Sequence, residues 1–417
     1  MEMLNVFWED RLVGRLWLDA GQRLIFRYEQ DYLESEEVHP LSLGLPLRRE
    51  PYADDTARPF FSNLLPEGDI RDHIAKILHV SKANDFALLR EIGRECAGAV
   101  SILPEGHAPS FSGEYLPLSS DELEDMIEHR ERTPLLAARK DLRLSLAGAQ
   151  DKLPVYISGD GMYLPAENAP SSHILKPQIR GFADTVHNEA FCMRLAATVL
   201  PTGRVPTIAV WHSRRGVEND ALIVERYDRV RDEDGHIGRM HQEDFCQALG
   251  YLPHNKYENE GGPCLNECFT LLSDFSTQPI VDRMHLIRWV IFNFLIGNRD
   301  AHAKNLAIVF RDGRPHLAPF YDLLCTQVYP DLVSKMSMKV GGEIRPDWVR
   351  WRHWERFARD IEVKPALVID LLREYADRLP DEAQAVADSF CKDHGGREIV
   401  DKIIDVISTN AKEIHGL

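Results

Sequence analysis

Basic residues are in short supply in this sequence. Its 417 residues include 49 lysines and arginines against 66 aspartates and glutamates, which gives a formal net charge of −17. A protein that contacts nucleic acid directly needs a basic surface to bind the phosphates. The composition therefore argues against direct binding of DNA or RNA, and we expect any contact with DNA to come from a partner protein.

The sequence also shows no long apolar run and no recognisable targeting segment. The stretch MEMLNVFWEDRL has no basic region followed by an apolar one, so we expect no signal peptide. The most apolar segment, 285–297, contains Arg288 and Asn293 and is too short to span a bilayer. We expect a cytoplasmic protein without membrane contact, in which this segment is a buried helix.

Cysteine is scarce and irregularly spaced. The seven cysteines are an odd number spread over a long chain, which is typical of reduced thiols in a cytoplasm rather than of a disulfide framework. Cys264 and Cys268 form the only close pair, and no second pair or histidine follows at the spacing of a zinc site. We interpret both as small core or loop residues.

Three common motifs of nucleotide and metal enzymes are missing. The sequence contains no G-x-x-x-x-G-K-[ST] loop, no G-x-G-x-x-G loop and no H-E-x-x-H helix. The last absence argues against a metal hydrolase of that type. Internal repeats and low-complexity tracts are also absent, so any chemistry must be sought in less regular clusters of polar residues.

Hydrophobic periodicity divides the chain into three parts. Residues 4–28 alternate as short antiparallel strands and helical spacing follows, so 1–110 is predicted to form a small α+β module. The stretch 105–118 is rich in Gly, Pro and Ser and is typical of a linker. A strand-rich lobe is expected at 119–235 and a helical lobe at 236–417. The predicted class is therefore α+β with two lobes behind the N-terminal module.

A packet of polar residues interrupts the apolar pattern of the helical lobe. The segment 296–310 reads IGNRDAHAKNLAIVF, and both of its flanks are apolar enough to be buried. Asp300 and Asn305 are five residues apart, and Asp322 follows the next apolar strand. In the catalytic loop of kinases, the base Asp and the metal-binding Asn have this spacing, and a metal-binding Asp follows at the next strand end.

Phosphoryl transfer explains why these residue types occur together. Mg²⁺ prefers oxygen ligands and few protein carboxylates. We therefore predict Asp300 as the base that orients and deprotonates the attacking hydroxyl, and Asn305 and Asp322 as ligands of Mg²⁺. His302 is predicted to brace the loop by hydrogen bonding. The alternative is an ordinary surface loop, which is polar because it faces solvent.

A cation for the phosphates of ATP is expected on a strand of the preceding lobe. Lys176 in HILKPQ fits this role, although a lysine on an apolar strand can also be an edge residue. Glu189 on the following helix is equally consistent with a partner of Lys176 and with a solvated carboxylate. The segment ALIVERYDR is expected to enter the hinge between the lobes, where the backbone of Glu225 and Tyr227 would meet adenine.

Small residues precede the first strand of this lobe. In LSLAGAQDKLPV, the residues Ala147, Gly148 and Ala149 are followed by Gln150. Small side chains allow backbone amides to approach a phosphate closely, although such a stretch is as often a simple turn. We predict that these four residues contact ATP.

Tryptophans recur every three residues near the end of the chain. Trp348, Trp351 and Trp354 alternate with arginines in RPDWVRWRHWERFARD. Such a stretch could stack on nucleic acid. The acidic net charge instead favours a helix whose tryptophans pack on one side while its arginines face solvent.

Several segments together resemble the HipA family of toxin serine/threonine kinases. The resemblance lies in SLAGAQDK, HILKPQ, NEAFCMRLA, ERYDR, GNRDAHAKN and FYDLL, and in FFSNLLPEG, DFALLREIG and CAGAV for that family's N-terminal domain. The motifs keep their order and cover nearly the whole chain. The resemblance implies a divergent, two-lobed protein-kinase-like fold that uses ATP and Mg²⁺.

The resemblance also implies a biological role. Members of the family phosphorylate a serine of a cellular protein, in known cases an aminoacyl-tRNA synthetase, and thereby cause growth arrest and persistence. A small helix-turn-helix antitoxin, HipB, binds the kinase and would supply the contact with DNA. Carried over by motif, Asp300 is the base, Asn305 and Asp322 bind Mg²⁺, Lys176 binds ATP and Ser145 is the site of autophosphorylation. A small-molecule kinase and a non-catalytic co-repressor are the alternatives.

Overall fold

The computed structural model describes residues 2–109, 113–137, 147–148, 150–166, 169–233, 235–332 and 334–416. Two residues with predicted roles, Ser145 and Ala149, lie outside these described residues. All seven cysteines are free thiols, as their spacing predicted. Among the described helices, none combines the length and the apolar character needed to cross a membrane.

The N-terminal module is an antiparallel sheet covered by short helices. Its strands follow the order β3-β2-β1-β4. The strands are β1 (Met3–Trp8), β2 (Arg11–Leu18), β3 (Leu24–Tyr28) and β4 (Val100–Pro104), and the helices are α1 (Gln30–Leu33), α2 (Asp54–Ser62), α3 (Gly68–Ile77) and α4 (Asp85–Ile92). Buried residues alternate along β3, as expected for a sheet with one buried face.

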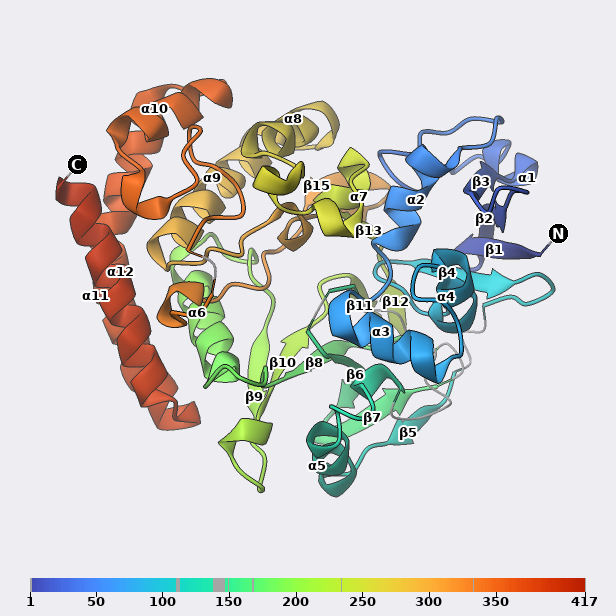
Figure 1. Cartoon of the computed structure of the whole chain (residues 1–417), viewed down its shortest axis with the longest axis horizontal. Helices are drawn as coiled ribbons and strands as arrows, with labels where there is room; N and C mark the ends of the chain where they lie inside the picture. The colour runs from blue at the N-terminus through green and yellow to red at the C-terminus, as the bar shows by residue number, and fades with distance from the viewer. Residues whose placement is uncertain are drawn as a thin grey trace.

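A six-stranded antiparallel sheet with the order β5-β7-β6-β8-β10-β9 forms the centre of the molecule. Its strands are β5 (Tyr115–Pro117), β6 (Leu153–Ser158), β7 (Gly161–Pro165), β8 (His173–Pro177), β9 (Ile208–Trp211) and β10 (Ala221–Glu225). Helix α5 (Ser120–Glu128) lies near one edge, and α6 (Thr185–Val199) packs against β9 and β10 (Figure 1). The register pairs Lys176 with Leu222, which places the lysine in the interior of the sheet.

The rest of the chain is mostly helical, as predicted. Its helices are α7 (Phe245–Leu249), α8 (Leu265–Phe275), α9 (Pro279–Leu295), α10 (Trp351–Asp360), α11 (Pro365–His394) and α12 (Arg397–Gly416). Its strands are β11 (Arg229–Arg231), β12 (Ile237–Arg239), β13 (Gln242–Asp244), β14 (Ala307–Arg311) and β15 (Arg314–Leu317). The predicted hairpin of β14 and β15 turns at Asp312 and Gly313, whose φ values of 50° and 70° suit a tight turn. In Figure 1, α11 and α12 lie at the end of the molecule opposite the N-terminal module.

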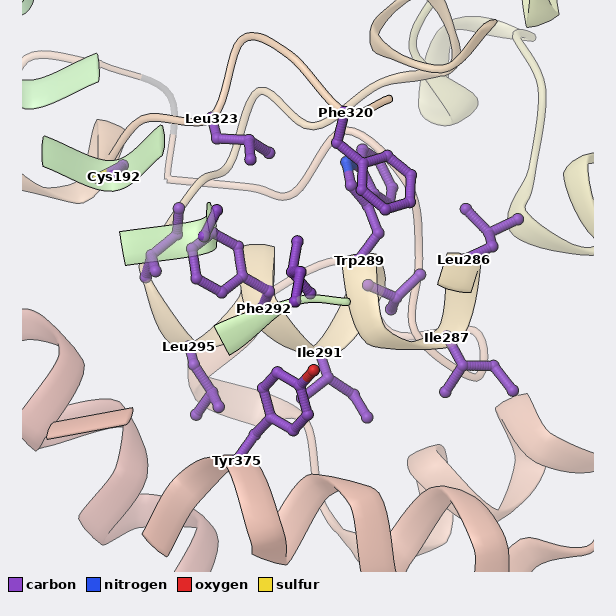
Figure 2. Packing of buried hydrophobic residues seen from close by; sticks show 14 of the residues in the cluster. Cys192, Leu286, Ile287, Trp289, Ile291, Phe292, Leu295, Phe320, Leu323 and Tyr375 are labelled. Carbon is purple, nitrogen blue, oxygen red and sulfur yellow. The ribbon is translucent and has the colours of Figure 1, made fainter. Parts of the chain in front are cut away.

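Helix α9 confirms the expectation of a buried apolar helix. Trp289, Ile291, Phe292 and Leu295 are each at most 2% exposed. Figure 2 shows these side chains spreading around the helix, with Tyr375 of α11 reaching toward them. Burying a large apolar side chain stabilises a protein by roughly 1.5–3 kcal/mol. The buried side chains of α9 therefore hold the helix, and the loop that follows it, in a fixed position.

Strand β10 separates two hydrophobic cores. Ala221 and Ile223 belong to the core shared with the N-terminal module, whereas Leu222 and Val224 belong to the core of α6 and the C-terminal helices. Successive side chains of a strand point to opposite faces, so one short strand contributes to both cores. The end of β10 therefore lies where the two halves of the molecule meet.

The tryptophan repeat packs mainly as expected. Trp354 of α10 is fully buried, and Trp351 packs partly buried against the same core. Trp348 differs: it ends a 3-10 turn before α10, is 54% exposed and lies under the guanidinium of Arg345. Trp348 keeps the three-residue spacing but precedes the first residue of α10, so it does not share the buried face of that helix.

Candidate active site

A cleft of about 410 Å³ lies between the six-stranded sheet and the helical lobe. Its walls come from the N-terminal module, the small-residue loop, β8, the end of β10 and the loops around Asp300 and Asp322. Among the predicted site residues, those that line it are Ala147, Gly148, Gln150, Lys176, Glu225, Tyr227, Asp300, His302, Asn305 and Asp322. Residues far apart in the sequence therefore share one space.

Lys176 is held between two carboxylates. Its Nζ donates a hydrogen bond to Glu189 Oε1 at 2.7 Å and another to Asp322. Burial alone would lower the pKa of Lys176, but the two carboxylates raise it above the ordinary lysine value. Of the two interpretations of Glu189, the structure has the paired one, because Glu189 is only 5% exposed and bonded to the lysine.

Asp300 is positioned by a loop braced with side-chain amides. The loop follows the end of α9, and the backbone N–H of Asp300 donates to Asn298 Oδ1 at 3.1 Å. Asn305 Nδ2 donates to the backbone oxygen of Asp300 at 3.2 Å. The carboxylate of Asp300 accepts a hydrogen bond from the Tyr257 hydroxyl at its Oδ1, at 3.0 Å. One carboxylate oxygen is thus oriented by Tyr257, and Oδ2 has no role in that bond.

His302 makes its loop-bracing hydrogen bonds through its backbone, and not through Nδ1 of its ring. Its Nδ1 is buried and has no hydrogen-bond partner among the described residues. Burial lowers the pKa of His302 to about 4, so the ring is neutral near pH 7. The ring packs edge-on against Tyr257 with 5.5 Å between centroids. The backbone N–H of His302 donates to the backbone oxygen of Asp300 at 2.9 Å. The backbone of His302 thus holds the loop by hydrogen bonding, and its ring adds packing.

Asp322 has an unusual backbone conformation. Its φ of 53° lies in the left-handed region, which Asp and Asn tolerate better than most other residues. Burial would raise the pKa of Asp322, but Lys176 and Lys152 lower it well below the ordinary value. A residue other than glycine with a positive φ at a cleft is typical of a functional position.

The small-residue loop, 147–150, lines the cleft with its described residues Ala147, Gly148 and Gln150. Gly148 has a φ of 111°, and its backbone oxygen accepts a bond from the N–H of Glu67 at 3.0 Å. Gln150 Nε2 donates to the backbone oxygen of Pro177 at 3.2 Å. The loop is thereby tied to the N-terminal module at one point and to the end of β8 at another.

Lys152 is a cleft residue that sequence reasoning missed. Its Nζ donates to the backbone oxygen of Ala147, and a Cβ added at Gly148 would lie 2.8 Å from Nζ. Burial lowers the pKa of Lys152 to about 8. The signal was available, because this lysine comes only four residues after Gly148 in SLAGAQDK.

The predicted hinge residues lie at the end of β10. The N–H of Glu225 donates to the backbone oxygen of Thr207 at 2.9 Å. The Tyr227 ring stacks on Tyr321 with 6.0 Å between centroids, and its hydroxyl donates to Gln242. Both Glu225 and Tyr227 line the cleft. Their contact with adenine stays a prediction.

The N-terminal module also contributes to the cleft. Lys304 Nζ donates to Asn63 Oδ1 and, at 3.0 Å, to Asp244 Oδ2, while Glu67 lies 3.5 Å away. Lys256 lies 3.2 Å from Glu67 on the other side. Sequence reasoning missed this contact, because Asn63 and Lys304 are 241 residues apart. The three polar residues of FFSNLLPEG, which are Ser62, Asn63 and Glu67, were the only local signal.

A buried ionic cluster attaches the hinge to the same module. Arg226 bonds to Asp228 at 2.7 Å, and Arg229 bonds to Glu95 at 2.9 Å, with all four side chains at most 4% exposed. The N–H of Gly98 donates to Asp228 at 2.8 Å. The arginines lower the pKa of the Asp228 carboxyl far below its usual range, although burial opposes them. Arg226, Asp228 and Arg229 of ERYDR therefore hold the hinge rather than face solvent.

Comparison with known proteins places most of the chain in one family. The HipA N-terminal domain matches residues 4–103, and the HipA-like C-terminal domain matches residues 144–383. The serine/threonine-protein kinase toxin HipA of Shewanella oneidensis is 30% identical over 393 residues, which cover 91% of this chain and 87% of that protein. A Sinorhizobium fredii protein named "Putative kinase Y4mE" is 42% identical over 392 residues, which cover 93% of this chain and 91% of that protein.

A solved structure extends the likeness to the fold. A chain of the HipA, HipB and operator DNA complex of Shewanella oneidensis MR-1 matches with a TM-score of 0.86 and 28% identity. The match covers 99% of this chain and 98% of that one. It confirms the expected two-lobed, kinase-like α+β fold. The chain belongs to the HipA family of kinase toxins.

Proposed function

We propose that this protein is an ATP- and Mg²⁺-dependent serine/threonine protein kinase. The observation that carries the proposal is the cleft in which Lys176 bridges Glu189 and Asp322 while Asp300 and Asn305 line the same space. Phosphoryl transfer needs little covalent chemistry from the protein, because catalysis consists mostly of positioning and charge neutralisation. This set of residues can supply both.

The two lysines would bind the phosphates of ATP. Lys176 stays charged because Glu189 and Asp322 raise its pKa, and Glu189 keeps its ammonium group in place. Lys152 faces the small-residue loop, where Gly148 allows close approach. Its pKa of about 8 would rise next to a polyphosphate, since a nearby negative charge favours the charged form. The backbone at Glu225 and Tyr227 would contact adenine.

Asn305 and Asp322 would hold Mg²⁺. The amide nitrogen of Asn305 is used in its bond to the Asp300 backbone, which leaves Oδ1 as an oxygen ligand. Asp322 is deprotonated, because the neighbouring lysines lower its pKa. A carboxylate and an amide oxygen suit a hard cation, which would neutralise charge on the phosphates when bound.

Asp300 would serve as the base. Tyr257 orients its Oδ1, so Oδ2 can accept the proton of a substrate serine hydroxyl. The neutral ring of His302 packs beside Tyr257 and limits the movement of the tyrosine ring that orients Asp300. The role of His302 is thus one of positioning.

We extend the proposal to the biological role that family membership suggests. The protein would act as a toxin that phosphorylates a cellular protein, with an aminoacyl-tRNA synthetase as the leading candidate, and would cause growth arrest and persistence. A HipB-like antitoxin would bind it and make the DNA contact, in keeping with the net charge of −17. Ser145 would be its autophosphorylation site. The proposed domains are 1–110, 119–235 and 236–417.

The deciding experiment compares the phosphoproteomes of cells that express the wild type or Asp300→Asn. We expect growth arrest and new phosphoserine in a cellular protein only with the wild type. The purified variant should still bind ATP, because Asp300 is proposed to act on the hydroxyl rather than on the nucleotide.

Two outcomes would contradict the proposal. Growth arrest by Asp300→Asn would point to sequestration of a partner instead of phosphorylation. Label from ATP that appears in a small metabolite and in no protein would favour a small-molecule kinase. Intact-mass analysis of the wild type with Mg-ATP tests Ser145 in the same preparation, since one added phosphate should map to that residue.

A further inference from the structure

Two histidines and an aspartate meet outside the cleft. His187 lies in the first turn of α6, His212 directly follows β9, and Asp220 directly precedes β10. One ligating atom from each lies within 4.8 Å of the other two. Three separate segments of the strand-rich lobe thus converge at the place where α6 packs on the β9–β10 edge (Figure 1).

The spacing of the three side chains suits a metal ion. His212 Nδ1 is 3.0 Å from Asp220 Oδ2, and His187 Nε2 is 3.8 Å from the same oxygen. In a tetrahedral zinc site with bonds of about 2.0–2.2 Å, neighbouring ligand atoms are roughly 3.3 Å apart. We propose that His187, His212 and Asp220 form a binding site for Zn²⁺ or a similar borderline transition-metal ion.

Two of the three ligands are already fixed by their surroundings. Asp220 is 1% exposed, and its Oδ1 accepts a hydrogen bond from the N–H of Ser213 at 2.9 Å. His187 is 2% exposed and lies against Gly396, where an added Cβ would be 2.7 Å from the imidazole Cγ. Ligands held in place in this way lose little conformational freedom when a metal binds.

His187 has a second carboxylate suited to an outer-shell role. Its Nε2 lies 2.9 Å from the backbone oxygen of His394, so the imidazole proton is on Nε2 in the metal-free state. Its Nδ1 is buried without a hydrogen-bond partner among the described residues, and Asp184 Oδ1 is 3.7 Å away. Metal binding at Nε2 would replace its bond to the His394 oxygen and place the ring proton on Nδ1, from which the N–H can donate a hydrogen bond to Asp184. Metal-bound histidines usually donate their other N–H to such a group.

The third ligand leaves the site open to solvent. The side chain of His212 is 46% exposed, so it offers an entry path and space for a water as fourth ligand. The nearby His394 is not counted as a ligand, because it does not belong to the group of described side chains whose ligating atoms all lie within 4.8 Å of one another. Two imidazoles and one carboxylate select zinc-like ions over Mg²⁺, which prefers oxygen ligands alone. The site is thus chemically distinct from the cleft.

A bound ion would join α6 to the sheet. His187 is two residues before Glu189 on α6, and Asp220 leads into β10, which pairs with the strand of Lys176. The ion would therefore stabilise the folded state against heat by linking these elements. This binding does not depend on whether the protein transfers phosphate.

The test uses the full-length protein after removal of metals with a chelator. Titration with Zn²⁺ by calorimetry, with metal analysis of the dialysed complex, should give one tight site per chain and a higher melting temperature. His212→Gln and Asp220→Asn should weaken binding by at least the roughly 10–100-fold that loss of an outer-shell partner costs. Co²⁺ in place of Zn²⁺ should give the visible absorption bands of a four-coordinate site in the wild type.

His415→Gln is the matched control. His415 also lies near a carboxylate, 3.2 Å from Asp377, but this exposed pair has no third ligand among the described residues. The control should bind Zn²⁺ like the wild type. His212 is half-exposed, so the His212→Gln variant should melt like the metal-free wild type. Absence of a saturable site in the wild type, or wild-type affinity in His212→Gln, would overturn the proposal.

Discussion

Two lysines of the cleft lie in opposite electrostatic surroundings. Lys176 has carboxylates on both sides, which raise its pKa despite burial. Lys152 bonds to a backbone oxygen, and burial lowers its pKa to about 8. Lys176 is therefore a permanent cation, whereas Lys152 is mostly charged at pH 7 and loses its charge as pH rises through about 8. At the scale of single residues, the surroundings of a lysine, and not its residue type alone, set its pKa.

Asp322→Asn should abolish the metal-dependent part of ATP binding. The change keeps the size of the side chain and removes the charge that faces Lys176. Calorimetry with ATP and Mg²⁺ should show affinity reduced at least about tenfold, or about 1.4 kcal/mol. Asp312→Asn is a suitable control, because Asp312 is exposed and also has a positive φ, of 50°. Wild-type affinity in a folded Asp322→Asn protein would remove Asp322 from the proposed site.

Tyr257→Phe should lower turnover without changing ATP binding. The variant keeps the ring beside His302 and removes the hydroxyl that orients Asp300. A net hydrogen-bond contribution of about 0.5–1.5 kcal/mol corresponds to a kcat lowered roughly 2–12-fold. Tyr251→Phe is the control, because Tyr251 bonds to Glu267 at 2.7 Å in another place. Equal kcat values for the two variants would show that Tyr257 does not position the base.

At the scale of elements, the loop after α9 is a junction as well as a candidate catalytic loop. The 3-10 turn Ala303–Asn305 carries Lys304, which reaches Asn63 of the N-terminal module and Asp244 at the end of β13. The residue that follows, Asn305, faces the cleft. Within one turn, Lys304 thus holds the N-terminal module and Asn305 takes part in the proposed chemistry. A shift of the N-terminal module would therefore also move Asn305 in the cleft.

Lys304→Met should destabilise the protein strongly. The change leaves Asp244 and Glu67 without their central cation in a buried place, and breaking a buried pair costs about 3–5 kcal/mol. Chemical denaturation measures the free energy of unfolding. Lys256→Met is the matched control, because Lys256 also pairs with Glu67 but is less buried. If the control lost as much stability as Lys304→Met, the proposed central role of Lys304 would be wrong.

At the scale of the whole molecule, the segment 41–43 is hydrogen-bonded to β13 and to His241, which directly precedes this strand. His241 Nε2 donates to the Leu41 oxygen at 2.8 Å, and Glu243 accepts bonds from the N–H of Leu43 at 2.8 Å and from the Ser42 hydroxyl. Burial lowers the pKa of His241 to about 4 and raises that of Glu243 to about 8. The contact between the N-terminal module and the helical lobe is therefore sensitive to pH.

Glu243→Gln should flatten the dependence of stability on pH. The ordinary pKa of this carboxyl is 4.5 and burial raises it to about 8, so between these values the folded state binds the proton more tightly than the unfolded state. The contribution of Glu243 to the free energy of unfolding is full below pH 4.5 and is lost as pH rises toward 8, by about 1.4 kcal/mol per unit. Urea unfolding at pH 5, 6.5 and 8 measures the difference between wild type and variant. Parallel profiles would contradict the assignment.

Local patterns determined much of this protein. Alternation and the Asp312-Gly313 turn sufficed to predict the β14–β15 hairpin, and the apolar run at 285–297 sufficed to predict a buried helix. The spacing of Asp300 and Asn305 within one loop indicated that both would reach the same space, as they do. Each of these features depends on contacts between residues close in sequence, where backbone geometry limits the alternatives.

Only the tertiary structure decided which distant residues join them. Asn63 meets Lys304 across 241 residues, and the packing of the N-terminal module sets that contact. The choice for Glu189 between lysine and solvent depended on whether the packing of α6 on β9 and β10 would bring it to Lys176. The histidine and aspartate cluster at α6 likewise arises only where three segments converge. Sequence spacing carries no information about such meetings, because they depend on how the two hydrophobic cores pack against each other.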